Sequence, residues 1–192
     1  MRIEAIVIKK SDQGEHGETV QLYTATAGKV MAVAKGLKRK TSKQAAHLEP
    51  FNLIDCRLIA GQGLPIIASA HSRASFPDIK ASLPKLALGF YLLELMDQLI
   101  YENEADSTLW QWLKTKLENL EQLDGAELDH TISKKYLLAM RTELMDILGY
   151  KSLSSGIAPA VEYLMQNLVN RPALALQFSS DLFRDLAVNE VK

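Results

Sequence analysis

The residues best suited to chemistry are a run of cations between positions 35 and 43. Five of these nine residues are basic and none is acidic; the cations are Lys35, Lys38, Arg39, Lys40 and Lys43. Fixed positive charge of this density is what a phosphate backbone neutralises on binding, with release of its condensed counterions. The run therefore predicts contact with nucleic acid. The alternative is a merely solvated basic loop, and charge alone leaves both interpretations open.

Further candidates for DNA contact are cations on or beside the predicted strands, namely Lys9, Arg57 and Arg73. Two aromatic residues of the same region, Tyr23 and Phe51, are candidates for base stacking if their rings are exposed. The other fate open to Phe51 is burial in the core.

The sequence offers few parts for catalysis. The four histidines are widely separated and form no metal-binding pattern, and no phosphate-cradling or nucleophile motif is present. Gly61-Gln62-Gly63 lies between two predicted strands, which indicates a hairpin turn. The single cysteine, Cys56, excludes an intramolecular disulfide and a cysteine-rich zinc site. We therefore expect no catalytic residue, no cofactor and no metal.

Composition separates the chain into two unlike parts. The 192 residues are 47% hydrophobic, enough for a core, and the net charge is −1. Residues 1–76 carry a balance of +5, whereas residues 77–192 carry −6. One part suits phosphate and the other repels it. The lone cysteine and the lack of a leader-like start predict a cytoplasmic protein, and the longest apolar stretch, residues 86–100, is too short and too interrupted to span a membrane.

Five short segments with alternating apolar residues precede residue 76, at 3–8, 19–24, 29–35, 51–59 and 64–75. In the third, Val30, Ala32 and Ala34 fall on one face of an extended chain and Gly36 breaks the run. Polar, glycine-containing turns make the second and third segments a hairpin, and the fourth and fifth another. A closed five-stranded OB-fold barrel fits them better than an open sheet with two exposed edges.

Helical periodicity replaces the alternation after residue 76. The expected helices are a central apolar one from Leu83, then 107–123, 131–148, 158–169 and 173–187. Asp106 or Ser107 should cap the second of these, and Gly149 should end the third. The chain is thus predicted to be an α+β protein: a basic, nucleic-acid-binding OB-fold at 1–76, and an acidic helical domain at 77–192 that packs on the barrel and binds partners.

The order of these features resembles the bacterial recombination mediator family RecO. The first motifs are Gly14-Glu15, Leu22-Tyr23-Thr24, Gly28-Lys29-Val30, AVAKG at 32–36 with its basic tail, and L-x-PF at 48–51. A Gly-x-Gly-Leu-Pro hairpin at 61–65, SFP at 75–77, YLLEL at 91–95 and LGY at 148–150 follow. Their order and spacing over about 150 residues carry the resemblance.

The resemblance implies a function in DNA repair and recombination without catalysis. Members bind single- and double-stranded DNA, anneal complementary strands and, with RecR, help to load RecA onto strands covered by the single-stranded DNA-binding protein SSB. This implies RecR and the acidic C-terminal tail of SSB as partners, RecA as an indirect one, and a nucleoid-associated protein. Many members also carry a four-cysteine zinc module after the LGY helix, for which this chain lacks the cysteines.

The acidic helical domain is a poor phosphate surface, so we expect it to bind protein. An apolar groove between helices with a local cation, Lys134, Lys135 or Arg141, would suit the SSB tail. A solvated helix face is the alternative for these cations. Two other functions stay open: an OB-fold adaptor that binds protein, and an RNA-binding OB module.

Overall fold

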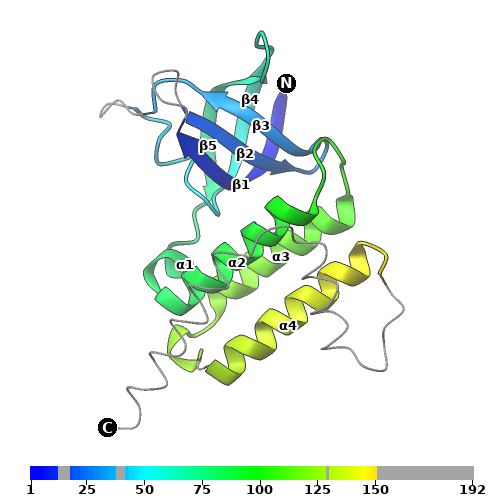
Figure 1. Ribbon diagram of the computed structural model, residues 1–192. Helices are drawn as coiled ribbons and strands as arrows, with labels where there is room; N and C mark the ends of the chain where they lie inside the picture. The colour runs from blue at the N-terminus through cyan, green and yellow to red at the C-terminus, as the bar shows by residue number, and fades with distance from the viewer. Residues whose placement is uncertain (13–17, 38–41, 129, 151–192) are drawn as a thin grey trace. The chain divides into compact units, whose positions relative to one another are not determined.

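The computed structural model describes residues 1–12, 18–37, 42–128 and 130–150 of the chain. Its strands are β1 (Arg2–Asp12), β2 (Glu18–Thr24), β3 (Gly28–Ala34), β4 (Leu53–Ile59) and β5 (Ile66–Ala74). They form a closed barrel in the order β1-β2-β3-β5-β4, so that β1 also pairs with β4 (Figure 1). A closed barrel leaves no long unpaired edge. The predicted five-stranded OB-fold is confirmed.

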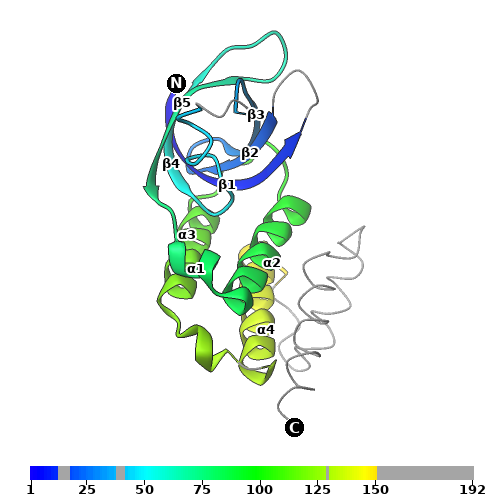
Figure 2. The ribbon, with the colours of Figure 1, turned by 90° about the vertical axis from the view of Figure 1, so that its left-hand side faces the viewer.

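The barrel is closed by one strand that bends and by one short parallel contact. β1 pairs with β4 through Arg2–Ile6 and with β2 through Ala5–Asp12, and its curvature is visible in Figure 2. The β1–β2 register shifts between Val7 and Lys9, a bulge of the kind that bends and twists a strand. β3 and β5 meet in parallel at Val33 and Ile66. The Val33 N–H donates to the Pro65 carbonyl at 2.8 Å, which completes the ring.

Alternation along each strand fills the barrel interior. In β1 the side chains of Ile3, Ala5 and Val7 point inward and are buried. The rest of the interior cluster is Val20, Leu22, Ala32, Ala34, Leu37, Leu48, Ile54, Cys56, Ile67 and Ala70. Since successive side chains of a strand point to opposite faces, Arg2 and Glu4 lie on the outer face of β1.

The strand bounds differ modestly from the predicted ones. β1 runs on into the polar segment and reaches Asp12. β4 starts at Leu53 and not at Phe51, because Phe51 has a φ of +74°, a left-handed conformation that does not continue a strand. β5 starts after Pro65, which has no N–H to donate to a ladder.

Four α-helices and one short 3-10 helix, Gly125–Glu127, follow the barrel in the described part of the chain. The α-helices are α1 (Pro77–Ala81), α2 (Leu83–Leu99), α3 (Ser107–Gln122) and α4 (His130–Ile147). α2 is apolar around most of its circumference, as predicted for the central helix. The helices predicted at 158–169 and 173–187 lie outside the described residues.

The predicted helix ends are confirmed in detail. The Asp106 carboxylate accepts the N–H groups of Thr108 at 2.7 Å and Leu109 at 3.1 Å, and so caps α3. Gly149 has a φ of +90° and ends α4, with the Tyr150 N–H donating to the Met145 carbonyl at 2.9 Å.

Packing divides the chain into two compact units that do not coincide with the expected split after residue 76. The first is Met1–Phe76 with Ile100–Leu117; the second is Pro77–Leu99 with the described residues from Glu118 onward. The expectation that all of 77–192 forms the helical domain is therefore corrected for Ile100–Leu117, which returns to the barrel.

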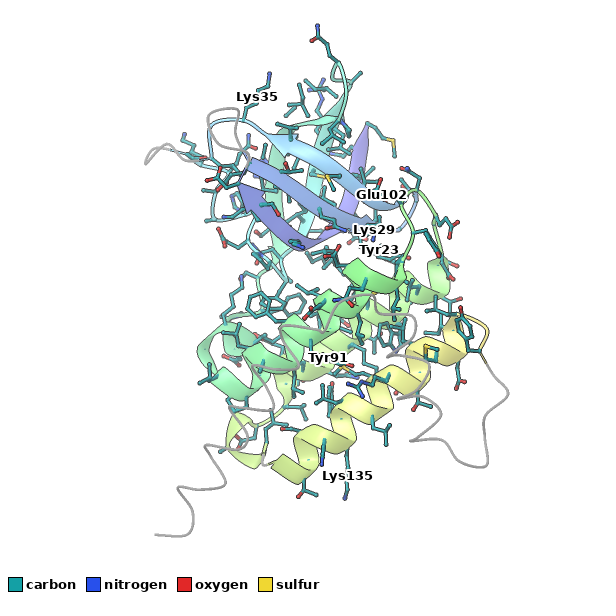
Figure 3. All side chains as sticks on the ribbon, in the orientation of Figure 1. Tyr23, Lys29, Lys35, Tyr91, Glu102 and Lys135 are labelled. Atoms are coloured by element: carbon teal, nitrogen blue, oxygen red, sulfur yellow. The ribbon has the colours of Figure 1, made fainter. Side chains whose placement is uncertain are left out.

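Contacts along β2 and β3 explain why Ile100–Leu117 groups with the barrel. The rings of Tyr23 and Trp110 lie 6.3 Å apart. The backbones of Lys29 and Glu102 form an isolated parallel β-bridge, and Figure 3 shows these two residues beside Tyr23. The Asn103 N–H donates to the Lys29 carbonyl at 2.9 Å. The segment thus covers an outer face that the barrel would otherwise expose.

Candidate nucleic-acid interface

The basic segment leaves the barrel at the end of β3. Lys35 is exposed there and extends away from the barrel (Figure 3), and Gly36 has a φ of +73°, which turns the chain out of the strand. Leu37 then points back into the interior cluster and is only 6% exposed. Lys38, Arg39 and Lys40 lie outside the described residues. The segment's first end is therefore fixed by a buried leucine directly beside the predicted cations.

The second end of the segment is fixed by buried polar contacts. Lys43 is exposed, and five residues later Leu48 is fully buried in the interior cluster. The side-chain amide of Asn52, itself fully buried, donates to the carbonyls of Ala46 at 2.9 Å and His47 at 3.0 Å. Since a buried amide without partners is costly, these bonds hold the return path in one conformation.

His47 joins this return path to β5. Its Nδ1 accepts the Ser72 N–H at 3.2 Å and lies 3.0 Å from the Ser72 hydroxyl oxygen. Nearby, the Gln44 side chain donates to the Ala68 carbonyl at 3.2 Å. Sequence reasoning missed Asn52 and His47 as positioning residues. The available signal was a polar Asn between the apolar residues Phe51 and Leu53.

The strand cations divide into two groups. Lys9 and Arg57 are exposed on β1 and β4, as a phosphate contact requires. Arg73 is instead engaged by carboxylates: its Nη1 lies 2.7 Å from a Glu4 oxygen and its Nε lies 3.6 Å from an Asp55 oxygen. These carboxylates compete with phosphate for the guanidinium, but its side chain is 55% exposed, so a DNA contact of Arg73 stays a prediction.

The predicted stacking residues are buried. Tyr23 is fully buried against Trp110, and its hydroxyl donates to the Asp106 carbonyl at 3.5 Å. Burial first, and the Asp106 carboxylate second, raise the pKa of Tyr23 to about 12. Phe51 is 1% exposed, so of its two expected fates, base stacking and burial in the core, burial is the one observed. The condition stated for base stacking, an exposed ring, is therefore not met by Tyr23, because a segment far away in sequence, residues 100–117, covers it.

The helical candidates also divide. Lys134 and Lys135 are exposed on α4, and Figure 3 shows Lys135 pointing away from that helix. Arg141 is buried: its Nε–H donates to the Tyr91 hydroxyl, and its guanidinium carbon lies 5.2 Å from the centre of the Tyr91 ring. Arg141 therefore stabilises the contact between α2 and α4. The prediction that it is a surface cation available to an acidic tail was wrong, because its side chain is buried.

The cysteine and the potential metal ligands of the described residues offer no reactive site. Cys56 is buried in β4, and desolvation, then Asp55, raise its thiol pKa to about 11, which keeps the sulfur protonated and a poor nucleophile. Among the described residues, no group of three His, Cys, Asp or Glu side chains is placed to hold a metal ion. Within the same ranges, no helix has the length and apolar character needed to cross a membrane.

Comparison with known proteins relates the barrel to DNA repair. Residues 1–76 match the family model described as recombination protein O N terminal. The chain is also similar to the DNA repair protein RecO of Geobacter metallireducens, with 31% identity over 150 residues that cover 78% of this chain and 59% of the relative. The RecO protein of Shouchella clausii is 33% identical over 125 residues, which cover 65% of this chain and 49% of that protein.

A third relative extends the match along the chain. The RecO protein of Geobacter sulfurreducens is 29% identical over 164 residues, 85% of this chain and 65% of the relative. The chain therefore spans less than two thirds of the length of these curated relatives. The resemblance carried by the sequence motifs is confirmed, and the chain belongs to the RecO family of DNA repair proteins, with residues 1–76 as its N-terminal OB-fold domain.

Proposed function

We propose that this chain is a non-catalytic DNA-binding protein that mediates recombination during DNA repair. It binds single-stranded DNA through the barrel, anneals complementary strands and assists RecA loading, together with RecR, on DNA covered by SSB. It also binds duplex DNA. Because its substrate would be chromosomal DNA, we place the protein in the cytoplasm, at the nucleoid. One observation carries the proposal: the barrel of a DNA repair family presents a basic segment whose two ends are anchored by Leu37 and Leu48.

The physical basis of annealing is charge neutralisation. Two single strands repel each other through their phosphates, and a protein that neutralises phosphates lowers that repulsion without forming or breaking a covalent bond. Lys35 and Lys43 stand exposed at the two ends of the segment, beside the anchored leucines. Since Leu37 and Leu48 are already held in the interior cluster, less conformational entropy is lost at these two positions when a strand binds.

Titration of the protein with single-stranded DNA at several salt concentrations tests the proposal. Phosphate-directed binding gives a linear fall of log affinity against log salt, with a slope of about −0.7 per contact on single strands. Binding without salt dependence would favour a protein-binding adaptor instead. Preference for RNA of the same sequence would indicate an RNA-binding module.

The proposal assigns partner binding to the helical part. The balance of −6 over residues 77–192 disfavours phosphate, while Lys134 and Lys135 supply exposed cations on α4 for an acidic peptide such as the SSB tail. RecR is the second proposed partner. A pull-down with SSB and with RecR tests whether the protein binds each of these two partners.

Charge reversal on α4 tests the proposed tail site. Lys134→Glu with Lys135→Glu is expected to weaken binding of an SSB tail peptide at least tenfold, because attraction at the two positions becomes repulsion. Affinity for single-stranded DNA should stay within twofold. Fluorescence anisotropy with labelled peptide and labelled DNA measures both, and unchanged peptide affinity would move the tail site to other residues.

Metal content gives an independent check. A structural zinc site of the four-cysteine type needs four thiolates, and this sequence has one cysteine, which is buried in β4. We expect elemental analysis of the purified protein to find no stoichiometric zinc, and a chelator to leave the Tm unchanged. One zinc per chain would contradict this.

A further inference from the structure

The outer face of β1, β4 and β5 carries two neighbouring rows of charged side chains. Arg2 on β1 lies directly opposite Arg57 on β4, which lies opposite Ser69 on β5. Two residues further along the same ladder, Glu4 on β1 lies opposite Asp55 on β4. Both rows therefore place like charges directly opposite each other, an arrangement that destabilises an antiparallel pair.

The hydrogen bonds at the start of β1 show how close Arg2 and Arg57 are. The nitrogen of Met1 donates to the Leu58 carbonyl at 2.7 Å, and the Leu58 N–H donates to the Met1 carbonyl at 2.9 Å. Met1 and Leu58 are thus a hydrogen-bonded pair, so the next pair, Arg2 and Arg57, is a non-hydrogen-bonded one. In such pairs the Cα atoms are about 4.5 Å apart and the side chains are at their closest.

The acidic row shows how the fold compensates a like-charge pair. Arg73 lies 2.7 Å from Glu4 and 3.6 Å from Asp55, so one guanidinium bridges both carboxylates. The basic row lacks this compensation: within the described part of the chain, the side chains of Arg2 and Arg57 make no hydrogen bond and no ion pair. Both side chains are exposed.

We propose that Arg2 and Arg57 together bind one phosphate of a nucleic-acid strand, as a second contact of the barrel beyond the basic segment; this rests on the proposed DNA binding. Each guanidinium presents a planar fork of donors that matches two oxygens of a phosphate, and the bound anion plays the role that Arg73 plays for the acids. A nucleic-acid strand is the favoured source of the anion because the same barrel carries the basic segment and a balance of +5 over residues 1–76.

Removal of both guanidiniums tests the site. Arg2→Gln with Arg57→Gln should lower the slope of log affinity against log salt by about 1.4 on single-stranded oligothymidylate, about 0.7 for each contact. Loss of repulsion should leave the double variant at least as stable as the wild type in low-salt chloride, so a weaker affinity cannot come from unfolding. Lys114→Gln with Lys116→Gln, which removes two charges from α3, is the charge-matched control and should leave the slope unchanged.

Inorganic phosphate gives a second reading that needs no DNA. When chloride is replaced by phosphate at equal ionic strength, the Tm of the wild type should rise more than the Tm of the double variant. An equal rise in both proteins, or an unchanged DNA slope, would overturn the site while leaving the proposed function intact. If the wild type bound no DNA, the proposed function would fail and the phosphate reading would still decide whether the pair binds an anion. Wild-type binding of an aspartate-rich peptide in place of DNA, lost in the double variant, would overturn the assignment to nucleic acid.

Discussion

Neutralising Lys38, Arg39, Lys40 and Lys43 together, each to glutamine, is expected to weaken DNA binding for all sequences alike. Phosphates are the same in every sequence, so their loss as contacts changes affinity and not preference. If all four cations meet phosphate, the slope of log affinity against log salt falls by about 2.8 on single strands and about 3.6 on duplex DNA. Gel-shift titrations across a range of salt concentrations measure both slopes.

The quadruple variant should fold normally, because Leu37 and Leu48 keep the anchors of the segment in the interior cluster. An unchanged melting curve verifies this. Lys114→Gln with Lys116→Gln, which removes two positive charges from α3, is a control away from the segment, for which we expect no change of slope. If the quadruple variant kept the wild-type slope, the phosphate site would lie elsewhere on the barrel.

Gly28→Ala is expected to cause the largest loss of stability from a single methyl group. Gly28 has a φ of +63°, and a Cβ built there would lie 2.0 Å from the backbone oxygen of Glu104. The left-handed conformation costs about 1–2 kcal/mol for a residue with a side chain, and overpacking against backbone adds about 1–3 kcal/mol. We expect the free energy of unfolding to fall by about 2–5 kcal/mol, measured by urea denaturation.

Gly63→Ala is the matched control for this substitution. A Cβ at Gly63 would meet no atom within 4 Å, so the same added methyl group should change the free energy of unfolding by less than about 0.5 kcal/mol. Equal stability of the two variants would show that Glu104 and its neighbours do not pack on β3 in solution.

Local signals in the sequence predicted most of the elements. Alternation identified five strands, and the capping chemistry of Asp106 and the backbone freedom of Gly149 placed two helix ends. These features depend on residues close in sequence, so a single chain carries enough information for them. The parallel contact of Val33 with Ile66 joins strands far apart in sequence, and no local pattern marks it.

The candidate site was harder to predict because exposure is a property of the whole fold. Arg73 and Arg141 have the same charge as Arg57, yet one is engaged by two carboxylates and the other is buried against Tyr91. Tyr23 is covered by a segment beginning 77 residues later. Arg2 gains significance only from its register with Arg57, which strand periodicity does not fix.

The return of Ile100–Leu117 to the barrel affects how the family's parts can be exchanged. The chain passes between the two units at three places, after Phe76, Leu99 and Leu117, so the first unit is discontinuous in sequence although its five strands are not. A chimera that takes only residues 1–76 from one relative sets Tyr23 and Gly28 against a foreign covering segment. Functional hybrids should therefore arise only when the strands and residues 100–117 are inherited from the same parent, and recombination of homologous genes inside residues 77–99 should produce mismatched barrels.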